Sequence, residues 1–460
     1  MIKQSQVDKR KLFGTDGIRG KANSFPMTAE VAIALGRAVT HYFQKSENRH
    51  SRPLIIVGKD TRRSCYMLEQ AFAAGVCSQG GEAILTGPLP TPGVAFCTQS
   101  MRADAGVMIS ASHNPYDDNG IKLFDANGYK LPDEVELEIE NLILDQDLIP
   151  TKFDSDLGKA QRLKHVFGRY VVQVKSALDK KYDLEGMRIV LDCANGAGYK
   201  VAPMIFEELG AEVITRGTEP NGTNINHECG SLYPERAQEM VKKYRADLGI
   251  CLDGDADRLI VIDDQANIIN GDVLIGLLTK LSVSQKRIGA NSEIVGTVMS
   301  NLGLEKYIKS LGLSFHRTKV GDRYIVERMR ESGALIGGEP SGHIVFHELA
   351  TTGDGCLAAL KVIEAIKHFD RKLSQLATEV KLFPQVIKNT KVKKKIPFEE
   401  LPNFQKVLEA SKEKLGDKGR VVVRYSGTES LARVMVEAET DQLVSEISDD
   451  LTASVQKELG

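Results

Sequence analysis

One pattern recurs along this chain and limits the folds that it can adopt. A short run of β-branched residues is followed by a polar or glycine-rich turn and then by an amphipathic helical stretch. The run 54–57 enters the turn 58–62 and a helical segment that begins near Ser64, and the same order returns after 187–191 and after 293–298. Strands that alternate with helices of this length are typical of βαβ units on mostly parallel sheets.

We therefore predict an α/β protein with three related α/β domains, whose mixed sheets are mostly parallel. Near residue 370 the pattern changes to β-rich stretches and a closing amphipathic helix over 442–459, which predicts a smaller C-terminal α+β domain. A chain of 460 residues also exceeds the roughly 250–300 residues at which a single core stops growing. We expect four domains around a central cleft, and the predicted bounds are 1–155, 156–255, 256–370 and 371–460.

Composition excludes several classes of function. The formal net charge is −2, and acidic and basic residues are well mixed along the chain. This charge balance gives no indication that the protein binds nucleic acid or an anionic membrane. The seven cysteines form no CxxC pair, which argues against a disulfide framework and a structural zinc site. No apolar stretch resembles a signal peptide or approaches the roughly 20 residues of a membrane-spanning helix. We expect a soluble, cytoplasmic protein.

The segment 252–258 (LDGDADR) follows an apolar strand over 248–252 and carries three aspartates at alternate positions. Side chains alternate along an extended segment, so we expect the three carboxylates to share one side. Clustered carboxylates repel one another unless a cation lies among them, which indicates a hard divalent ion. An EF-hand loop is excluded, because its sixth and twelfth positions would be Arg258 and Asp264 instead of Gly and Glu. An Asp-rich turn at a strand end remains the alternative.

Three further loops carry polar chemistry. The segment 109–115 (ISASHNP) follows an apolar strand over 105–109, and ligands of open α/β sheets bind beyond such strand ends. The segment 337–343 (GGEPSGH) offers glycines for close approach to a ligand, groups that suit sugar hydroxyls, and a histidine that can transfer protons. The segment 424–429 (RYSGTE), with Arg433, offers two guanidinium groups, hydroxyls and exposed amides for a phosphate. Each loop alone is also compatible with an ordinary turn.

Taken together and in this order, the four loops resemble those of the α-D-phosphohexomutase family over essentially the whole chain. In that family SASHNP holds the phosphoserine, DGDADR the metal, GExSGH the sugar and RxSGTE the substrate phosphate. The segments 13–20 and 317–324 are similar to the branch that acts on an amino-sugar phosphate. Pro340 departs from the polar residue common in that branch and bears on sugar preference, while Ser430 replaces a frequent proline.

The resemblance implies a role for each matching residue. Ser112 would carry the phosphoryl group, and Asp253, Asp255 and Asp257 would bind Mg²⁺ together with an oxygen of the phosphate on Ser112. Arg19 and Arg258 would contact the phosphoserine or the substrate, and Lys122 and His343 match the general acid and base. The sugar hydroxyls would be held by Glu339 and Ser341, and the distal phosphate by Arg424, Ser426, Gly427, Thr428 and Arg433.

The resemblance also implies an activity. The enzyme would move phosphate between O6 and O1 of a hexose through a phosphoserine and a bisphosphate intermediate, with one Mg²⁺ per chain and a hexose 1,6-bisphosphate as activator. Its partner would be a sugar phosphate, and the sequence is compatible with a homodimer. The alternatives are a phosphatase with the same serine and metal, a mutase of glucose or mannose phosphates, and a non-catalytic sugar-phosphate sensor. The intact acidic triad, serine, lysine and histidine count against a sensor.

Overall fold

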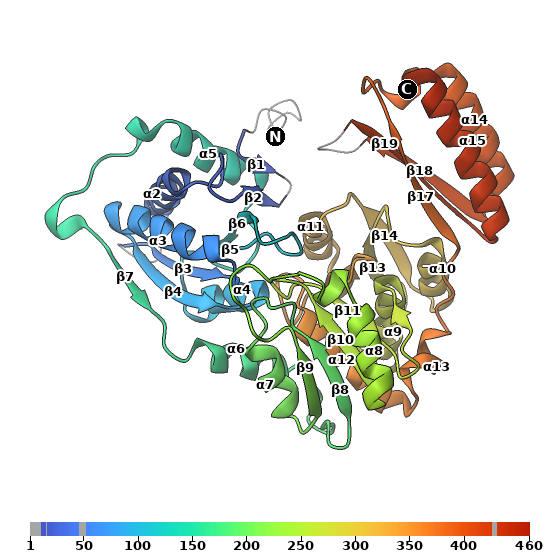
Figure 1. Ribbon diagram of the computed structural model, residues 1–460, viewed down its shortest axis with the longest axis horizontal. Coiled ribbons are helices and arrows are strands. Elements are labelled where there is room, and N and C mark those ends of the chain that lie inside the picture. Colours follow the sequence, from blue (N-terminus) through green and yellow to red (C-terminus); the bar gives the residue numbers. More distant parts are fainter. Residues whose placement is uncertain (1–10, 15, 46–51, 426–429) are drawn as a thin grey trace.

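A computed structural model describes residues 11–14, 16–45, 52–425 and 430–460 of the chain. The described residues form sheets of seven, five, four and three strands, which follow one another along the sequence (Figure 1). We call each sheet with its helices a unit. The predicted architecture, three α/β domains and a smaller C-terminal domain, is confirmed. None of the described helices is both long and apolar enough to cross a membrane.

The first unit contains the seven-stranded sheet, in the order β1-β2-β6-β5-β3-β4-β7. Its strands are β1 (Phe13–Gly14), β2 (Gly17–Lys21), β3 (Leu54–Lys59), β4 (Glu82–Pro88), β5 (Ala105–Ile109), β6 (Asp118–Asp125) and β7 (Lys159–Arg162). Its helices are α2 (Ala29–Lys45), α3 (Arg63–Ser78), α4 (Thr91–Ser100) and α5 (Asp133–Leu144), with 3₁₀ turns at Gln146–Leu148 and Asp154–Asp156.

Strand β3 of this sheet is buried on both faces, as the apolar run 54–57 predicts. Ile55 and Val57 on β3 belong to the core that includes buried residues of α2, α3 and α5. Ile56, between them, belongs to the other core, which continues into the second and third units. Because neighbouring residues of a strand face opposite sides, one continuous apolar run serves both cores.

The second unit has the strand order β12-β11-β10-β8-β9, and the third has β14-β13-β15-β16. The second contains α6 (Val166–Lys175), β8 (Arg188–Asp192), α7 (Val201–Glu207), β9 (Glu212–Arg216), a 3₁₀ turn at Gly230–Leu232, α8 (Glu235–Tyr244), β10 (Leu248–Leu252), β11 (Leu259–Ile262) and β12 (Ile268–Ile269). The third contains α9 (Gly271–Ser284), β13 (Glu293–Thr297), α10 (Leu302–Ser310), β14 (Ser314–Thr318), α11 (Asp322–Ser332), β15 (Ile336–Gly338), β16 (Ile344–Phe346), α12 (Gly355–Phe369) and α13 (Leu373–Ala377).

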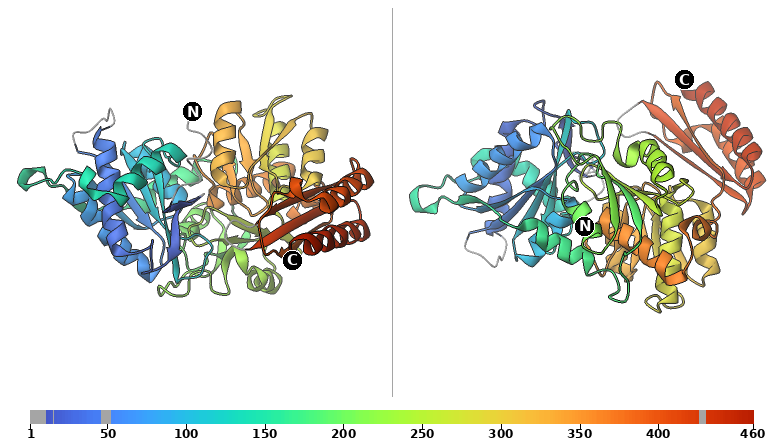
Figure 2. Two further views of the ribbon diagram at one scale, coloured as in Figure 1. Left: turned by 90° about the horizontal axis from the view of Figure 1, so that it is seen from above. Right: turned by 60° about the horizontal axis from the view of Figure 1, so that its bottom comes forward.

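The C-terminal unit is an antiparallel sheet in the order β17-β19-β18, packed against two helices. Its elements are β17 (Gln385–Lys391), a 3₁₀ turn at Phe398–Glu400, α14 (Pro402–Leu415), β18 (Gly419–Tyr425), β19 (Leu431–Ala438) and α15 (Asp441–Leu459). Both views of Figure 2 show this unit at the edge of the molecule, beside the third unit. Arg420 joins the two units, because its Nη1 donates to the carbonyl oxygen of Val298 at 2.8 Å.

All four motif loops occupy the same place in their sheets. Each connects a strand to the antiparallel strand beside it: β5 to β6, β10 to β11, β15 to β16, and β18 to β19. In the first three units the strand that precedes the loop also has a parallel partner on its other side. These three loops therefore leave the carboxyl ends of parallel strands, where α/β proteins bind their ligands.

Candidate active site

The aspartate motif forms the tight connection between β10 and β11. The last cross-strand pair is Leu252 with Leu259, which leaves residues 253–258 to make the turn. Asp253 Oδ1 accepts a hydrogen bond from the backbone N–H of Arg258 at 3.2 Å, and Ala256 has φ +57°. The expectation of an extended segment is thus wrong, because the backbone curls around the side chain of Asp253.

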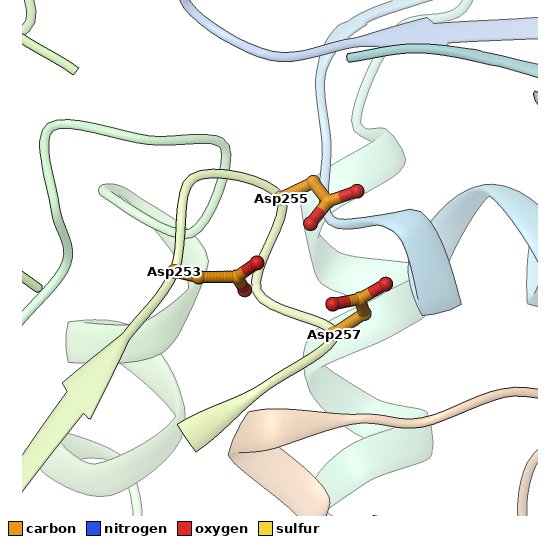
Figure 3. A group of neighbouring side chains, drawn as sticks. All are labelled: Asp253, Asp255 and Asp257. Atoms are coloured by element: carbon orange, nitrogen blue, oxygen red, sulfur yellow. The ribbon is translucent and has the colours of Figure 1, made fainter. Parts of the chain in front are cut away.

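The curled loop nevertheless brings the three carboxylates together. Asp253, Asp255 and Asp257 are buried, and one oxygen from each lies within 4.8 Å of the others (Figure 3). Burial raises the pKa of Asp253 well above its ordinary value, and the negative charges of Asp257 and Asp255 raise it further. One buried oxygen on Asp255 and one on Asp257, both Oδ1, accept no hydrogen bond from the residues that the structure describes. These groups fit a hard divalent cation such as Mg²⁺, which takes oxygen ligands.

Ser112 lies in the connection after β5 and faces this acidic cluster. Its side chain is buried, and Oγ donates a hydrogen bond to Asp253 Oδ2 at 2.6 Å. The backbone at Ser112 is left-handed, with φ +52°. The neighbouring His113 places Nδ1 3.4 Å from the Ser112 hydroxyl, and burial, reinforced by nearby Arg258 and Arg19, lowers the pKa of His113 to about 4.

Hydrogen bonds from two other segments hold the serine loop in this conformation. The buried Arg62 donates through Nη2 to the carbonyl oxygens of Ser112 at 3.2 Å and Asn114 at 2.5 Å. Asn226 of the second unit donates through Nδ2 to the same two oxygens, each at 2.9 Å. Asp60 positions Arg62 by an ion pair, so the loop is fixed from both the first and the second unit.

The sequence motifs assign no role to these holding residues. Asp60 and Arg62 belong to the turn 58–62, which directly follows a predicted strand, so a signal for them was present. Asn226 and Thr91 lie in segments without a distinctive pattern. Thr91 donates to Asp255 Oδ2 at 2.7 Å. A sequence offers no signal for such contacts, because they depend on how the units pack.

Lys122 on β6 reaches the acidic cluster from the first unit. Its Nζ lies 2.9 Å from Asp255 Oδ2, 3.3 Å from Asp257 Oδ2 and 3.5 Å from Asp16 Oδ2. Burial alone would lower the pKa of Lys122, but the carboxylates of Asp16, Asp255 and Asp257 outweigh it and raise the pKa well above its ordinary value. The side chain is therefore a buried ammonium ion.

His343 approaches the same cluster from the third unit. Its Nδ1 lies 3.8 Å from Asp257 Oδ1, and its Nε2 lies 3.6 Å from Asp322 Oδ2 and accepts a hydrogen bond from the backbone of Gly353 at 3.1 Å. Burial opposes protonation, but the carboxylates of Asp257 and Asp322 outweigh it, so the pKa of His343 is raised. In the same loop Ser341 Oγ donates to Glu339 Oε2 at 3.3 Å.

A cleft of about 420 Å³ opens between the first and third units. It is lined by Leu12, Gly14, Asp16, Gly17, Arg19, Arg258, Val320, Gly321, Asp322 and Glu339. The two arginines face a site that is otherwise rich in carboxylates, so they are the groups available to attract an anion. A larger cavity of about 600 Å³ lies between α14 and α15, on a part of the C-terminal unit that carries none of the predicted site residues.

The fourth loop belongs to the C-terminal unit. Arg424 and Arg433 are direct cross-strand partners on β18 and β19. Burial and the positive charge of Arg433 both lower the pKa of Arg424, and an anion between the two guanidinium groups would relieve that repulsion. The predicted residues Ser426, Gly427 and Thr428 lie outside the described part of the chain. The structure thus brings Ser112, Lys122, His343 and the three aspartates together, whereas the arginine pair lies on a separate sheet.

Comparison with known protein families assigns the class. Models of the phosphoglucomutase/phosphomannomutase family match the chain as α/β/α domain I over residues 10–149, domain II over 168–267, domain III over 270–383 and the C-terminal domain over 387–454. The chain belongs to this family of phosphohexose mutases, as its motifs predict.

Curated relatives narrow the class to one enzyme. The chain is 50% identical over 451 residues to phosphoglucosamine mutase from Nitratidesulfovibrio vulgaris (strain DP4), with 98% of this chain and 99% of the relative covered. Phosphoglucosamine mutase from Lawsonia intracellularis shows the same identity and coverage. The prediction of a mutase of this kind is confirmed.

Solved structures share the fold. A phosphoglucomutase/phosphomannomutase family protein from Burkholderia thailandensis superposes with a TM-score of 0.81 at 24% identity, covering 99% of this chain and 98% of that one. The N-acetylphosphoglucosamine mutase of Aspergillus fumigatus, solved with GlcNAc-6P and magnesium, gives a TM-score of 0.68 at 17% identity, with 98% of each chain covered.

Proposed function

We propose that this chain interconverts glucosamine 6-phosphate and glucosamine 1-phosphate through a phosphoserine at Ser112 and a 1,6-bisphosphate intermediate, and so supplies UDP-N-acetylglucosamine synthesis. The observation that carries the proposal is the 2.6 Å hydrogen bond from Ser112 Oγ to the buried carboxylate cluster. The half-identical phosphoglucosamine mutases support the choice of sugar.

The chemistry explains why the enzyme needs its own phosphate. O1 and O6 of one hexose are too far apart for a single in-line transfer. A phosphate ester on serine removes the need for a direct transfer, because the serine donates its phosphoryl group to one oxygen and later accepts a phosphoryl group from the other. Phosphate monoesters resist spontaneous hydrolysis, so the ester survives between turnovers.

Two transfers complete the reaction. In the first, O1 of glucosamine 6-phosphate attacks the phosphorus on Ser112, the bond from phosphorus to Oγ breaks, and the proton of the O1 hydroxyl leaves to a base while Oγ gains one. The bisphosphate intermediate then reorients so that its 6-phosphate faces Ser112. In the second transfer Oγ gives up its proton to a base and attacks the phosphorus of the 6-phosphate, the bond from that phosphorus to O6 breaks, and O6 takes up a proton.

We assign the two proton-transferring roles to Lys122 and His343. They reach the acidic cluster from different units, the first and the third, and both side chains are buried. A buried ammonium ion can also stabilise the charge that the moving phosphoryl group carries.

Asp253, Asp255 and Asp257, with an oxygen on Ser112, would hold Mg²⁺. When bound, the ion would neutralise charge on the transferring phosphoryl group. Arg19 and Arg258 would contact the phosphates, and Glu339 and Ser341 the sugar hydroxyls. Arg424 and Arg433, with Ser426, Gly427 and Thr428, would hold the distal phosphate in either orientation of the sugar.

The finer predictions from the sequence are kept as proposals. A hexose 1,6-bisphosphate would activate the enzyme by phosphorylating Ser112, and the cytoplasmic location and the homodimer stay predictions. The domain bounds near 155, 255 and 370 also stay predictions. Because β7 pairs with the first sheet and β11 with the second, these two sheets extend past residues 155 and 255.

One assay tests the function. Glucosamine 6-phosphate is mixed with enzyme, Mg²⁺ and a trace of glucosamine 1,6-bisphosphate, and the products are followed by phosphorus NMR. Formation of the 1-phosphate supports the proposal, whereas release of free phosphate would identify a phosphatase. Relative kcat/KM values for glucosamine, glucose and mannose 6-phosphates measure the enzyme's preference among the three sugars. This preference is of interest because Pro340 replaces a residue that is usually polar.

A further inference from the structure

Three consecutive residues at the start of α11 connect the sugar loop to the first unit. The backbone N–H of Gly321 donates to Glu339 Oε1 at 3.1 Å. The next residue, Asp322, accepts from Lys130 Nζ at 2.6 Å. Arg323 then donates to Glu136 Oε1 at 2.7 Å. Because Lys130 and Glu136 belong to the first unit, the segment is bonded on both sides of the cleft.

The arginine contact is a firm anchor. Arg323 forms ion pairs with both Asp133 and Glu136 on α5, and its side chain is only 7% exposed. Thr351, also in the third unit, donates to the carbonyl oxygen of Gly128 at 2.7 Å close by. Buried, paired charges of this kind hold a fixed geometry, since separating them would leave a charge without compensation.

Lys130 makes the contact nearest to the chemistry. Its ammonium group lies between Asp16 and Asp322, forms an ion pair with each, and is 9% exposed. Asp16 lies 3.5 Å from Lys122, and Asp322 lies 3.6 Å from His343. A continuous path of charged groups therefore joins Lys122 to His343, and Lys130 is at its middle.

We propose that Lys130 is a positioning residue that fixes the separation of Lys122 and His343 by joining Asp16 of the first unit to Asp322 of the third. The inference rests on the proposed function, since these are the two groups assigned to proton transfer. Without the ammonium ion, the carboxylates of Asp16 and Asp322 would face each other and repel. The backbone at Gly321 and Asp322, just before the Arg323 anchor, would then move outward and shift Glu339 of the sugar loop.

Such a displacement acts on the reaction more than on the fold. A shift of about 1 Å in a reacting group can cost about 100-fold in rate, while the anchor at Arg323 keeps the units together. The ground-state affinity for the sugar phosphate depends largely on the phosphate-binding arginines. Arg424 and Arg433 lie on the C-terminal sheet, but Arg19 pairs with Asp16 and so shares a partner with Lys130. The effect should therefore fall mainly on kcat, with a smaller change in KM through Arg19.

The test compares Lys130→Met with Lys130→Arg and with Lys280→Met. Lys280 is the matched control, because it pairs with Glu379 at 2.6 Å within the third unit, away from the cleft. We expect Lys130→Met to lower kcat by about 10- to 100-fold and to change KM by less than about threefold. Lys130→Arg should restore most of kcat, since it keeps the charge, and Lys280→Met should behave like wild type.

Hydrogen–deuterium exchange on the same proteins gives a readout that needs no activity. Faster exchange at the start of α11 in Lys130→Met, but not in Lys280→Met, supports the proposal. Unchanged exchange there, or a kcat within about twofold of wild type, would overturn it. So would an inactive Lys130→Arg together with a large fall in Tm, which would mark a purely structural role. If wild type itself lacks mutase activity, the proposed function fails, and the exchange data alone decide whether Lys130 joins the units.

Discussion

The hydroxyl of Ser112 donates a 2.6 Å hydrogen bond to Oδ2 of Asp253, and this bond joins the connection after β5 to the connection after β10. The two residues are 141 positions apart in the chain. Their contact exists because both loops leave equivalent positions in neighbouring sheets. It also places the proposed phosphate carrier next to the groups that fit its metal.

Replacing this serine tests the carrier directly. We expect Ser112→Ala to lower kcat by about a thousandfold or more, because no other group can hold the phosphoryl group between the two transfers. Intact-mass analysis should show one phosphate on part of the wild-type protein and none on the variant. The matched control is Ser176→Ala, a serine on the surface of α6's end, which should keep normal activity. A phosphorylated, active Ser112→Ala protein would refute the assignment.

The metal assignment predicts a change in Mg²⁺ dependence. Asp255→Asn removes one negative charge from the cluster, so we expect the Mg²⁺ concentration for half-maximal activity to rise by at least about 10-fold. Titration of activity against Mg²⁺ measures this directly. Asp264→Asn changes an aspartate that pairs with Lys372 outside the cluster and serves as the control. Identical Mg²⁺ curves for Asp255→Asn and wild type would remove Asp255 from the site.

The serine loop should depend on Asn226. Replacing Asn226 by Ala deletes two hydrogen bonds, to the carbonyl oxygens of Ser112 and Asn114. Arg62 still donates to both oxygens, so the loss is that of two ordinary hydrogen bonds, about 0.5–1.5 kcal/mol each, and a fall in kcat of about 10-fold is expected as the loop relaxes. Asn267→Ala, which removes a side-chain bond to Asp263 in a remote turn, is the control. Equal kcat values in the two variants would contradict a positioning role for Asn226.

Stability should depend on pH through Asp272 on α9. The pKa of Asp272 is raised from an ordinary value of 3.8 to about 7, chiefly by burial and in smaller part by the charge of Glu437, against the opposing effect of the Asn301 N–H. The folded state therefore holds a proton that the unfolded state has lost, so stability should fall as pH rises from about 4 to about 7.

Asp272→Asn tests that dependence, because the amide oxygen can still accept from Asn301 N–H while the charge is gone. We expect Tm of the variant to exceed that of wild type by about 2–4 °C at pH 8 and by less at pH 5. Thermal unfolding followed by circular dichroism at the two pH values measures the difference. A variant whose Tm is lower by the same amount at both pH values would show that the charge of Asp272 is not the cause.

The sequence by itself determined the local pieces. The apolar runs 54–57, 105–109 and 248–252 predicted strands because β-branched and aliphatic residues fit a sheet that is buried on both faces. The spacing of the aspartates after β10 indicated a metal site, and the resemblance of the four loops to the α-D-phosphohexomutase family identified Ser112 as the phosphate carrier. The extended segment predicted for the three aspartates was wrong, because a tight turn carries them.

Only the tertiary structure decided which groups meet. Four residues position groups around the site through hydrogen bonds. No sequence pattern predicts which partners they bind: Arg62, Thr91, Asn226 and Lys130. Asn226 reaches a loop in another unit, and Lys130 joins carboxylates that are 114 and 192 positions away in the chain. Short-range patterns report local backbone preferences, whereas these contacts arise from the packing of separate units, which depends on all of their buried surfaces at once.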